Sequence, residues 1–424
     1  MISGMDVRKK EFSNGLVVVS EAMPHLRSAS IGIWVKTGAR SENPDQGGIS
    51  HFIEHLLFKG TKRRSTAKIA ETIDATGGHM NAFTEKEYVG YYAKVLDEHL
   101  PIAFDLLSDM ARNPAFPADE IERERNVIFE EINMVEDSPQ ELIQDLFLER
   151  FWREHPLGRP IAGTRETVSG ITPADIRRFF RKHYTVSNMI VTVAGNILHR
   201  EVERLAARYL AGAPSTVRSK SSQPPSNRAS RFVRTKANLE QVHVCLGTTA
   251  PPMASKDHYT AHLLCNILGG GMSSRLFQNI REKRGLVYSI YSMLNQYRDA
   301  GALVVYAGTA PGTAAEVVEL TIRELSRFRD KMVTPRELKR AKENMKGSIV
   351  LSLESSSSRM SNLAQQLIYR DRFYELEEIL EAVERVTARE IRDLANTMFD
   401  GSSLTMAALG NRQTRGLKSV SLEL

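Results

Sequence analysis

Two histidines four residues apart, with a glutamate directly before the second, are the residues in this 424-residue chain best suited to chemistry. They are His51, Glu54 and His55, in the stretch "GGISHFIEHLLFKGT" over residues 47–61. On a helix, at about 100° per residue, the two imidazoles lie about 40° apart and Glu54 lies about 60° to the other side of His51. All three therefore share one face, and the apolar residues between them predict that the rest of the helix is buried.

This arrangement favours a metal site. Neutral imidazoles at this spacing can bind one zinc ion, and the carboxylate between them then faces the open position as a general base. The alternative is a buried amphipathic helix whose polar groups serve only packing. The order HxxEH is the HExxH zinc motif read backwards, which favours zinc. We predict His51 and His55 as ligands of one zinc ion and Glu54 as the base.

A third ligand is expected from the helical stretch "EIERERNVIFEEINMVED", residues 120–137. Its apolar residues fall within about 60° of Glu131 around the helix, whereas Glu130 lies about 100° away. A carboxylate in the middle of a buried stripe needs a partner, so Glu131 is the predicted ligand. The alternative, a solvated acidic face, suits Glu130. Glu124 lies on the same stripe two turns earlier and is predicted to orient a ligand.

The elements that position these residues occur twice. The closing segments of the two halves, "ITPADIRRFFRKHYTVSNMIVTVAGN" and "VTAREIRDLANTMFDGSSLTMAALGN", align at a constant offset, which indicates a duplication. A Ser-, Pro- and Arg-rich stretch separates the two halves of the chain. We therefore predict domains at 1–212 and 231–424, joined by a linker at 213–230. Strands and long helices without regular alternation predict an α+β fold, with two α/β sandwich domains of antiparallel-rich sheets covered by helices.

The duplication bears on the metal site. The second half reads "HLLCN" where the first reads "HFIEH", so His262 remains while Cys265 and Asn266 replace Glu54 and His55. A helix that needed these polar groups only for packing would need them in both copies. Only the first half is therefore predicted to bind metal.

Several motifs in order carry a resemblance to a known family. "NGLVVV", the HxxEH segment, "GGHMNAFTEKEYVGYYAKV", the "ERxxxxxEE" helix and "REKRGLVYSIYS" resemble the pitrilysin family of zinc peptidases, in the bacterial type of the mitochondrial processing peptidase branch. The resemblance implies a metalloendopeptidase with one zinc per chain, acting on peptides or unfolded protein segments. It also implies a clam-like chamber of four repeats, of which this chain supplies two. A homodimer, or a heterodimer with a paralogue, is therefore expected.

The resemblance implies further site residues. Asn81 and Thr84, in "NAFT", would lie on or beside an edge strand that receives the substrate as an added strand. Asn81 could instead be a turn residue after the preceding glycines. Arg281 and Tyr288, in "REKRGLVY", would hold the substrate and stabilise charge on the scissile carbonyl oxygen. Without the resemblance, Arg281 suggests surface charge and Tyr288 a core residue.

Substrate preference has two candidate determinants. Glu141 and Asp145, one helical turn apart, occupy positions that the resemblance assigns to gripping an arginine near the cleaved bond. Two carboxylates on one face suit a guanidinium, although a solvated acidic face is the alternative. Phe58 lies on the zinc face about 20° from His51 and could stack on a hydrophobic side chain after the cut bond. A basic residue near the cleaved bond is the expected preference.

Composition narrows the function classes. The net charge is +6, but no interleaved basic and aromatic motif predicts nucleic-acid binding. No apolar run of about 18 residues predicts a membrane span, and the first residues lack the pattern of a secretion signal. Two cysteines suit a reducing compartment, so a cytoplasmic location is expected. A non-catalytic partner subunit is the competing class, but such relatives have a decayed metal motif and this chain retains every element of it.

Overall fold

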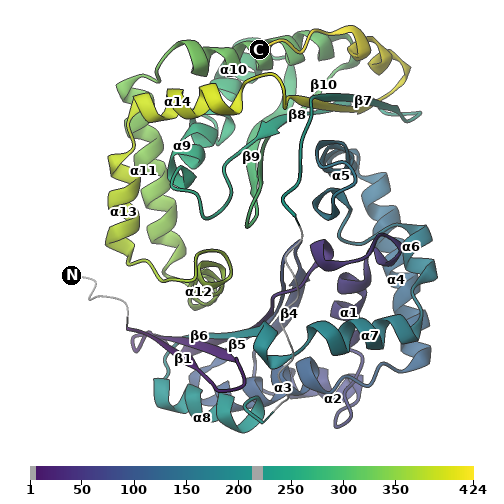
Figure 1. Cartoon of the computed structure of the whole chain (residues 1–424), viewed down its shortest axis with the longest axis vertical. Helices are drawn as coiled ribbons and strands as arrows, with labels where there is room; N and C mark the ends of the chain where they lie inside the picture. Colours follow the sequence, from purple (N-terminus) through teal and green to yellow (C-terminus); the bar gives the residue numbers. More distant parts are fainter. Residues whose placement is uncertain (1–5, 213–222) are drawn as a thin grey trace. The chain divides into compact units, whose positions relative to one another are not determined.

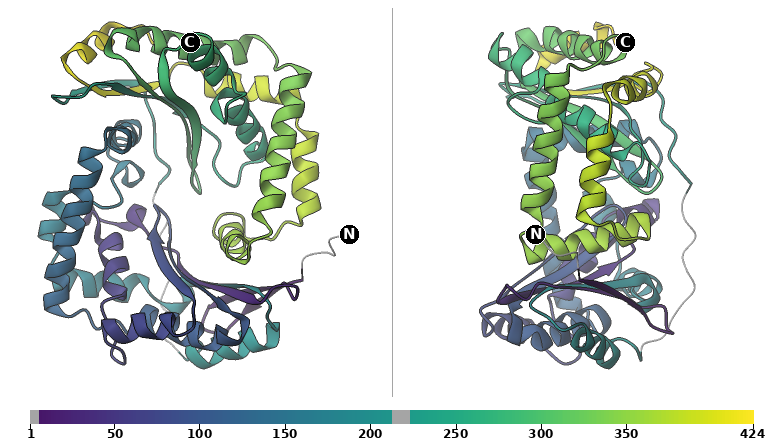
Figure 2. Two further views of the ribbon diagram at one scale, coloured as in Figure 1. Left: turned by 180° about the vertical axis from the view of Figure 1, so that it is seen from behind. Right: turned by 90° about the vertical axis from the view of Figure 1, so that its left-hand side faces the viewer.

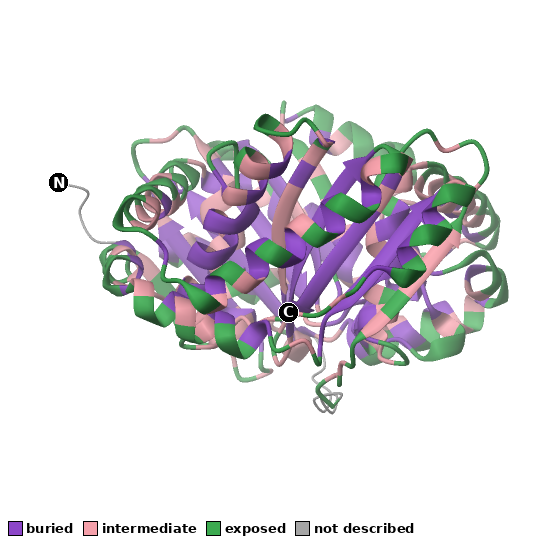
Figure 3. Ribbon diagram, turned by 90° about the horizontal axis from the view of Figure 1, so that it is seen from above, coloured by how far each residue is buried: buried purple, intermediate pink, exposed green. Residues whose placement is uncertain are grey.

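The computed structural model describes residues 6–212 and 223–424. These residues form two compact units, each built around one β-sheet (Figures 1 and 2). Of the described residues, the first unit contains 6–133, 159–212 and 350–375, and the second contains 134–158, 223–349 and 376–424. In both units the inner strands of the sheet are buried, the edge strands are partly exposed, and the helices expose their outer faces (Figure 3).

The first sheet has six strands in the order β1-β2-β6-β3-β5-β4. β2 and β6 pair in parallel, whereas the other neighbours are antiparallel. The strand bounds are β1 Val7–Glu11, β2 Val17–Ala22, β3 Ser28–Val35, β4 His79–Thr84, β5 Val89–Leu96 and β6 Met189–Gly195. β4 is an edge strand, as the sequence analysis expects for the segment "NAFT".

Helices cover both faces of this sheet. Along β3, Ile31 and Ile33 point to one face, where α1 (Ile49–Leu57), α3 (Leu100–Arg112) and α8 (His199–Tyr209) complete the larger core. Trp34 points to the other face, where α12 (Ser356–Arg370) packs. The Trp34 indole donates a hydrogen bond of 2.7 Å to Thr192 Oγ1, which satisfies its only polar atom. Because both faces are covered, β3 is buried along almost its whole length.

The second sheet repeats this topology. Its order is β7-β11-β8-β10-β9, and its one parallel pair, β7 with β11, corresponds to β2 with β6. The strand bounds are β7 Ser230–Thr235, β8 Val242–Thr249, β9 Val287–Gln296, β10 Gly301–Thr309 and β11 Thr405–Gly410. Two homologous units with mixed, mostly antiparallel sheets covered by helices confirm the predicted fold class.

Each half of the chain contributes one helix to the other unit. α5 (Pro139–Phe151) precedes the predicted linker but packs on β11 and β8 of the second sheet. α12 follows the linker but packs on β6 and β3 of the first sheet. The predicted domains 1–212 and 231–424 therefore differ from the compact units by these two exchanged segments. Helical periodicity shows that α5 has an apolar face, but it carries no information on which sheet that face covers.

The remaining helices flank the two sheets. They are α2 Thr66–Asp74, α4 Ala118–Asp137, α6 Arg165–Gly170, α7 Pro173–His183, α9 His258–Gly269, α10 Ala314–Asp330, α11 Pro335–Ser352, α13 Leu376–Arg385 and α14 Ala388–Met398. Among the described residues, no helix is long and apolar enough to cross a membrane. Residues 213–222 of the predicted linker lie outside the described residues.

Candidate metal centre

The start of α1 is fixed by a buried carboxylate. Gly48 precedes the helix with a left-handed φ of 95°, and a Cβ there would lie 2.6 Å from the Ala162 carbonyl oxygen, so only glycine fits. Glu42 accepts hydrogen bonds from the backbone N–H groups of Gly48 (2.9 Å) and Ser50 (2.8 Å), which otherwise lack partners at a helix start. Burial raises the pKa of Glu42 to about 7. Glu42 is not among the predicted site residues; its only signal in the sequence is an acidic residue shortly before the helix.

Three predicted ligands meet between α1 and α4. His51 Nε2 lies 3.4 Å from one Glu131 carboxylate oxygen, and His55 Nε2 lies 3.6 Å from the other. One ligand atom from each residue lies within 4.8 Å of the others. Tetrahedral zinc with bonds of about 2.0–2.1 Å places ligand atoms about 3.4 Å apart, so the trio fits zinc. No other group of His, Cys, Asp and Glu in the described part of the chain has this arrangement.

The protonation of His51 suits metal binding. Burial, and to a lesser extent the charge of nearby His55, lower the pKa of His51 to about 4. Its imidazole is therefore neutral near pH 7 and has a lone pair to donate.

Glu124 contacts His55, one of the ligands that it is predicted to orient. Its buried carboxylate lies 3.1 Å from His55 Nδ1 and accepts the proton of that nitrogen, which leaves the Nε2 lone pair facing Glu131. The other carboxylate oxygen lies 2.8 Å from Lys59 Nζ, which supplies the opposite charge that a buried carboxylate requires. Lys59 is not among the predicted site residues, although its position four residues after His55 is a usable signal.

Glu54 is held beside the ligand trio. Thr84 Oγ1 donates a hydrogen bond of 2.6 Å to Glu54 Oε2. Burial raises the pKa of Glu54, and the hydrogen bond from Thr84 opposes that shift. The hydroxyls of Tyr91 and Tyr184 are buried close to Glu54 and lie 2.8 Å apart. Burial raises the pKa of both tyrosines, and the negative charge of Glu54 adds to this effect. The carboxylate is thus held in a largely buried position through its Oε2.

The burial of α4 differs from the prediction at Glu131. Ile121, Glu124 and Ile128 are buried, but Val127 is 42% exposed and Met134 is 70% exposed. Glu131, with its side chain 40% exposed, therefore lies at the border of the buried stripe and not at its centre. Apolar character alone does not distinguish residues that pack from residues beside an open site. Glu130 is exposed, as predicted.

The predicted substrate residues of the first unit lie around β4. Thr84 is buried and contacts Glu54, whereas Asn81 is exposed and its side-chain oxygen accepts a hydrogen bond from Ala82 N (2.8 Å). β4 pairs with β5 on one side and with no other strand of the described residues. Phe58 directly follows α1 and is half-buried against the core. Their roles toward a substrate stay predictions.

The remaining candidates belong to the second unit. Arg281 lies in the short helical segment η6 (Phe277–Glu282), and its guanidinium carbon is 5.9 Å from the ring centroid of Tyr288 on β9. Tyr288 is 77% exposed, so the alternative that made it a core residue is wrong. Glu141 is exposed and Asp145 half-buried, one turn apart on α5. The functions predicted for these four residues stay predictions.

The equivalent helix of the second unit, α9, carries other interactions. His262 Nε2 lies 2.9 Å from Gln296 Oε1, and the Cys265 thiol donates to Ser292 Oγ at 3.3 Å. These contacts join α9 to β9.

Two imidazoles and a carboxylate around a zinc-sized space, with a second carboxylate beside them on a buried helix, define a metallohydrolase type of site. The chain belongs to the insulinase family of peptidases, peptidase family M16. The model of that family, "Insulinase (Peptidase family M16)", matches residues 17–165, and the "Peptidase M16 inactive domain" matches residues 170–345. The resemblance to zinc peptidases is confirmed at the level of the family, whereas the processing-peptidase branch stays a prediction.

Related proteins match this chain over nearly its whole length. The uncharacterized zinc protease YmxG of Bacillus subtilis is 39% identical over 93% of this chain and 96% of its own length. An uncharacterized zinc protease of Rickettsia felis is 35% identical over 96% of this chain and 98% of its own length. The crystal structure of a Helicobacter pylori protease shares the fold, with a TM-score of 0.90 and 24% identity over 96% of this chain and 99% of that one. A peptidase M16 inactive domain from Pseudomonas fluorescens superposes with a TM-score of 0.88 and 20% identity, over 96% and 98%.

Proposed function

We propose that this chain is a zinc-dependent endopeptidase that hydrolyses extended peptides or unfolded protein segments. The observation that carries the proposal is one constellation within the first unit: the trio of His51, His55 and Glu131, with Glu54 beside it and bonded to the edge strand β4. The names of the relatives, zinc protease, support the same metal and reaction.

The residues divide the chemistry between them. His51 Nε2, His55 Nε2 and Glu131 would hold the metal, which when bound supplies Lewis-acid chemistry that lets water ionise near neutral pH. Glu54 accepts the proton of the attacking water at Oε1 and returns it to the leaving amine. Its raised pKa brings the carboxylate closer to the operating pH, where proton transfer in both directions is efficient.

The edge strand supplies the substrate site. The outer backbone N–H and C=O groups of β4 can pair with a peptide in extended conformation, and main-chain pairing recognises any sequence. Thr84 ends this strand and touches Glu54, so a strand added there passes the base. Only unstructured segments can adopt this conformation, which excludes folded substrates.

The proposed function is tested on the purified chain. We expect about one zinc per chain, and cleavage of unstructured peptides that stops when a chelator removes the metal and returns with added zinc. Peptides with a basic residue near the cleaved bond should be preferred, if Glu141 and Asp145 act as predicted. Metal analysis measures the zinc content, and a peptide library read by mass spectrometry measures cleavage and the preference for a basic residue. Metal-loaded protein that cleaves no peptide would refute the proposal in favour of a non-catalytic partner subunit.

Thr84→Val should lower kcat while zinc content is unchanged. Removing a hydrogen bond to a charged group costs about 1.5–3 kcal/mol, which corresponds to roughly 10- to 100-fold if the bond positions the base. Thr84→Ser, which keeps the hydroxyl, is the matched control and should retain most of the activity. Steady-state kinetics with metal analysis tests this; equal activity in the Val and Ser variants would show that the hydrogen bond has no role in catalysis.

We further propose that the active site is shared in a dimer, with Arg281 and Tyr288 of one copy serving the zinc of the other. Mixing two inactive variants, Glu54→Gln and the double variant Arg281→Ala with Tyr288→Phe, then rebuilds one intact site in each mixed dimer. Random exchange makes about half of the dimers mixed, so activity should return to roughly a quarter of the parent level. Mass spectrometry of labelled chains establishes that exchange has occurred. Continued inactivity after exchange would show that the two residues act within their own chain or only structurally.

A further inference from the structure

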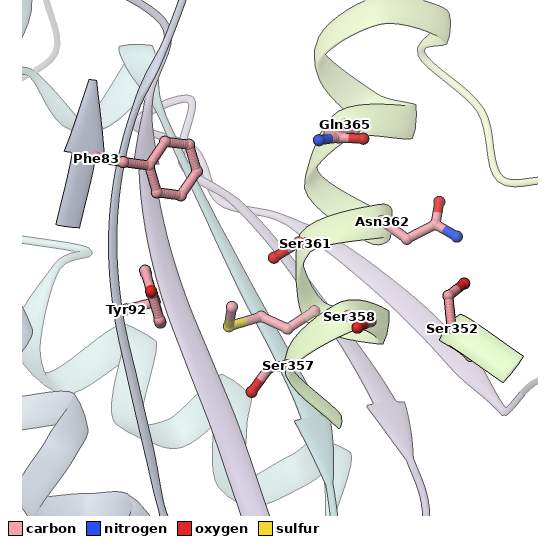
Figure 4. A pocket seen from close by; sticks show the side chains of 9 residues that line it. Phe83, Tyr92, Ser352, Ser357, Ser358, Ser361, Asn362 and Gln365 are labelled. Carbon is pink, nitrogen blue, oxygen red and sulfur yellow. The ribbon is translucent and has the colours of Figure 1, made fainter. Parts of the chain in front are cut away.

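A pocket of about 510 Å³ lies between the edge of the first sheet and α12. Its walls are Phe83 of β4, Tyr92 of β5, and side chains of α12 that include Ser357, Ser361, Asn362 and Gln365 (Figure 4). α12 packs mainly on β6, β3 and β2, and the same face of β5 and β4 lies at the margin of this packing. The pocket lies at that margin.

The pocket and the metal trio lie on opposite faces of β4. Successive side chains of a strand alternate between the two faces. Thr84 contacts Glu54 on the α1 face, so Phe83 points to the α12 face, where its ring centroid lies 5.9 Å from that of Trp34 and 6.2 Å from that of Tyr92. Asn81 stands opposite Tyr92 in the strand register and faces the same way. The free edge of the sheet therefore borders the pocket through Phe83.

A peptide added to β4 presents every second side chain to this face. We propose that the pocket is a substrate subsite that accepts a side chain pointing away from the metal, and that it selects a neutral side chain with an aromatic body and a polar tip, tyrosine above all. This inference rests on the proposed addition of the substrate strand to β4.

The walls of the pocket explain the selection. The rings of Phe83 and Tyr92 can pack against an aromatic side chain, and such ring pairs contribute about 0.5–1.5 kcal/mol beyond the buried area. The Ser361 hydroxyl and the side-chain oxygen of Gln365, whose Nε2 donates to the Tyr88 hydroxyl at 3.3 Å, offer a donor and acceptors to a phenol; the Ser357 hydroxyl lies 3.1 Å from Ser30 Oγ. No charged residue lines the pocket, so a lysine or glutamate side chain would lose water without gaining a partner of opposite charge.

The test uses the zinc-loaded enzyme and peptides that differ at one position at a time, each carrying Tyr, Ala, Lys or Glu. One position should show a kcat/KM for Tyr about tenfold or more above that for Glu and for Lys, the range that pocket contacts provide. Ser361→Phe fills the pocket and should reduce this ratio to near one while the alanine peptide changes little. Ser348→Phe makes the same change at an exposed position of α11 outside the pocket and should behave as the parent.

A second variant covers the case in which Ser361→Phe folds poorly. Gln365 is exposed on α12, and Gln365→Glu adds a charge to the pocket without filling it. At the selected position it should raise the kcat/KM for Lys over Glu about tenfold. The subsite proposal is overturned if no peptide position shows this preference for tyrosine, or if both variants keep the side-chain preferences of the parent enzyme. The proposed function stands in that case, because the enzyme still cleaves peptides. Zinc-loaded protein that cleaves nothing overturns the proposed function and the subsite together.

Discussion

Glu54→Gln is expected to keep the zinc of the parent protein and to lower peptide hydrolysis by about 10²- to 10⁴-fold. The carboxylate of Glu54 is not part of the ligand trio, so its loss removes no metal bond. An amide cannot accept the proton of water, although its oxygen can still accept the hydrogen bond from Thr84. The variant therefore removes proton transfer and little else. Zinc content and single-turnover cleavage measure the two effects separately.

The control for this prediction is Glu71→Gln. Glu71 is exposed on α2 in the same unit and pairs with Lys68, one turn away, so this variant should match the parent in both measurements. Parent-like activity in Glu54→Gln would show that another group is the base. Loss of zinc from Glu54→Gln would instead show that Glu54 is a ligand, which would change the assignment of the trio.

The part of the site that lies on one helix could be read from the sequence. His51, Glu54 and His55 are four residues apart at most, and the geometry of the α-helix fixes their relative directions before any tertiary contact forms. The structure brings all three to one side of α1, beside Glu131 and Thr84. Local spacing was sufficient here because the helix itself is the scaffold.

Contacts between elements that are far apart in the sequence were harder to predict. Glu131 was chosen partly because it seemed central in an apolar stripe, yet it lies at the border of the buried face. Glu42 and Lys59 were missed because their roles depend on where α1 begins and on a buried carboxylate from another helix. Patterns of hydrophobicity describe the faces of an element, whereas polar partners are set by tertiary packing.

The exchange of α5 and α12 has the same cause. Both helices have an apolar face, and each half of the chain contains a sheet that needs one cover. The sequence gives no preference between the two sheets, because the duplicated sheets are similar and a helix can pack on either. The internal repeat was enough to predict the fold class of the two sheets. Which sheet each of these two helices covers could be learned only from the structure.

Glu131→Gln is expected to weaken zinc binding by more than about 100-fold, whereas Glu130→Gln should change it little. Glu131 faces His51 and His55 with both carboxylate oxygens, so its amide variant loses the only anionic ligand of the trio. Glu130 is exposed on the neighbouring position of α4. Both variants make the same substitution in the same helix, at equal cost in helix propensity. Their difference therefore isolates the direction of the side chain.

Glu124→Gln extends this comparison to the residue that orients His55. It should weaken zinc binding by about 10- to 100-fold, the range found for groups that hold a ligand in place. Competition with a chromogenic chelator gives the three affinities on one scale, and the expected order of loss is Glu131, then Glu124, then Glu130. Equal losses from Glu131→Gln and Glu130→Gln would mean that the effect comes from the charge of α4 and not from coordination. In that case Glu131 could not be the third ligand, and the trio would have to be completed by another group.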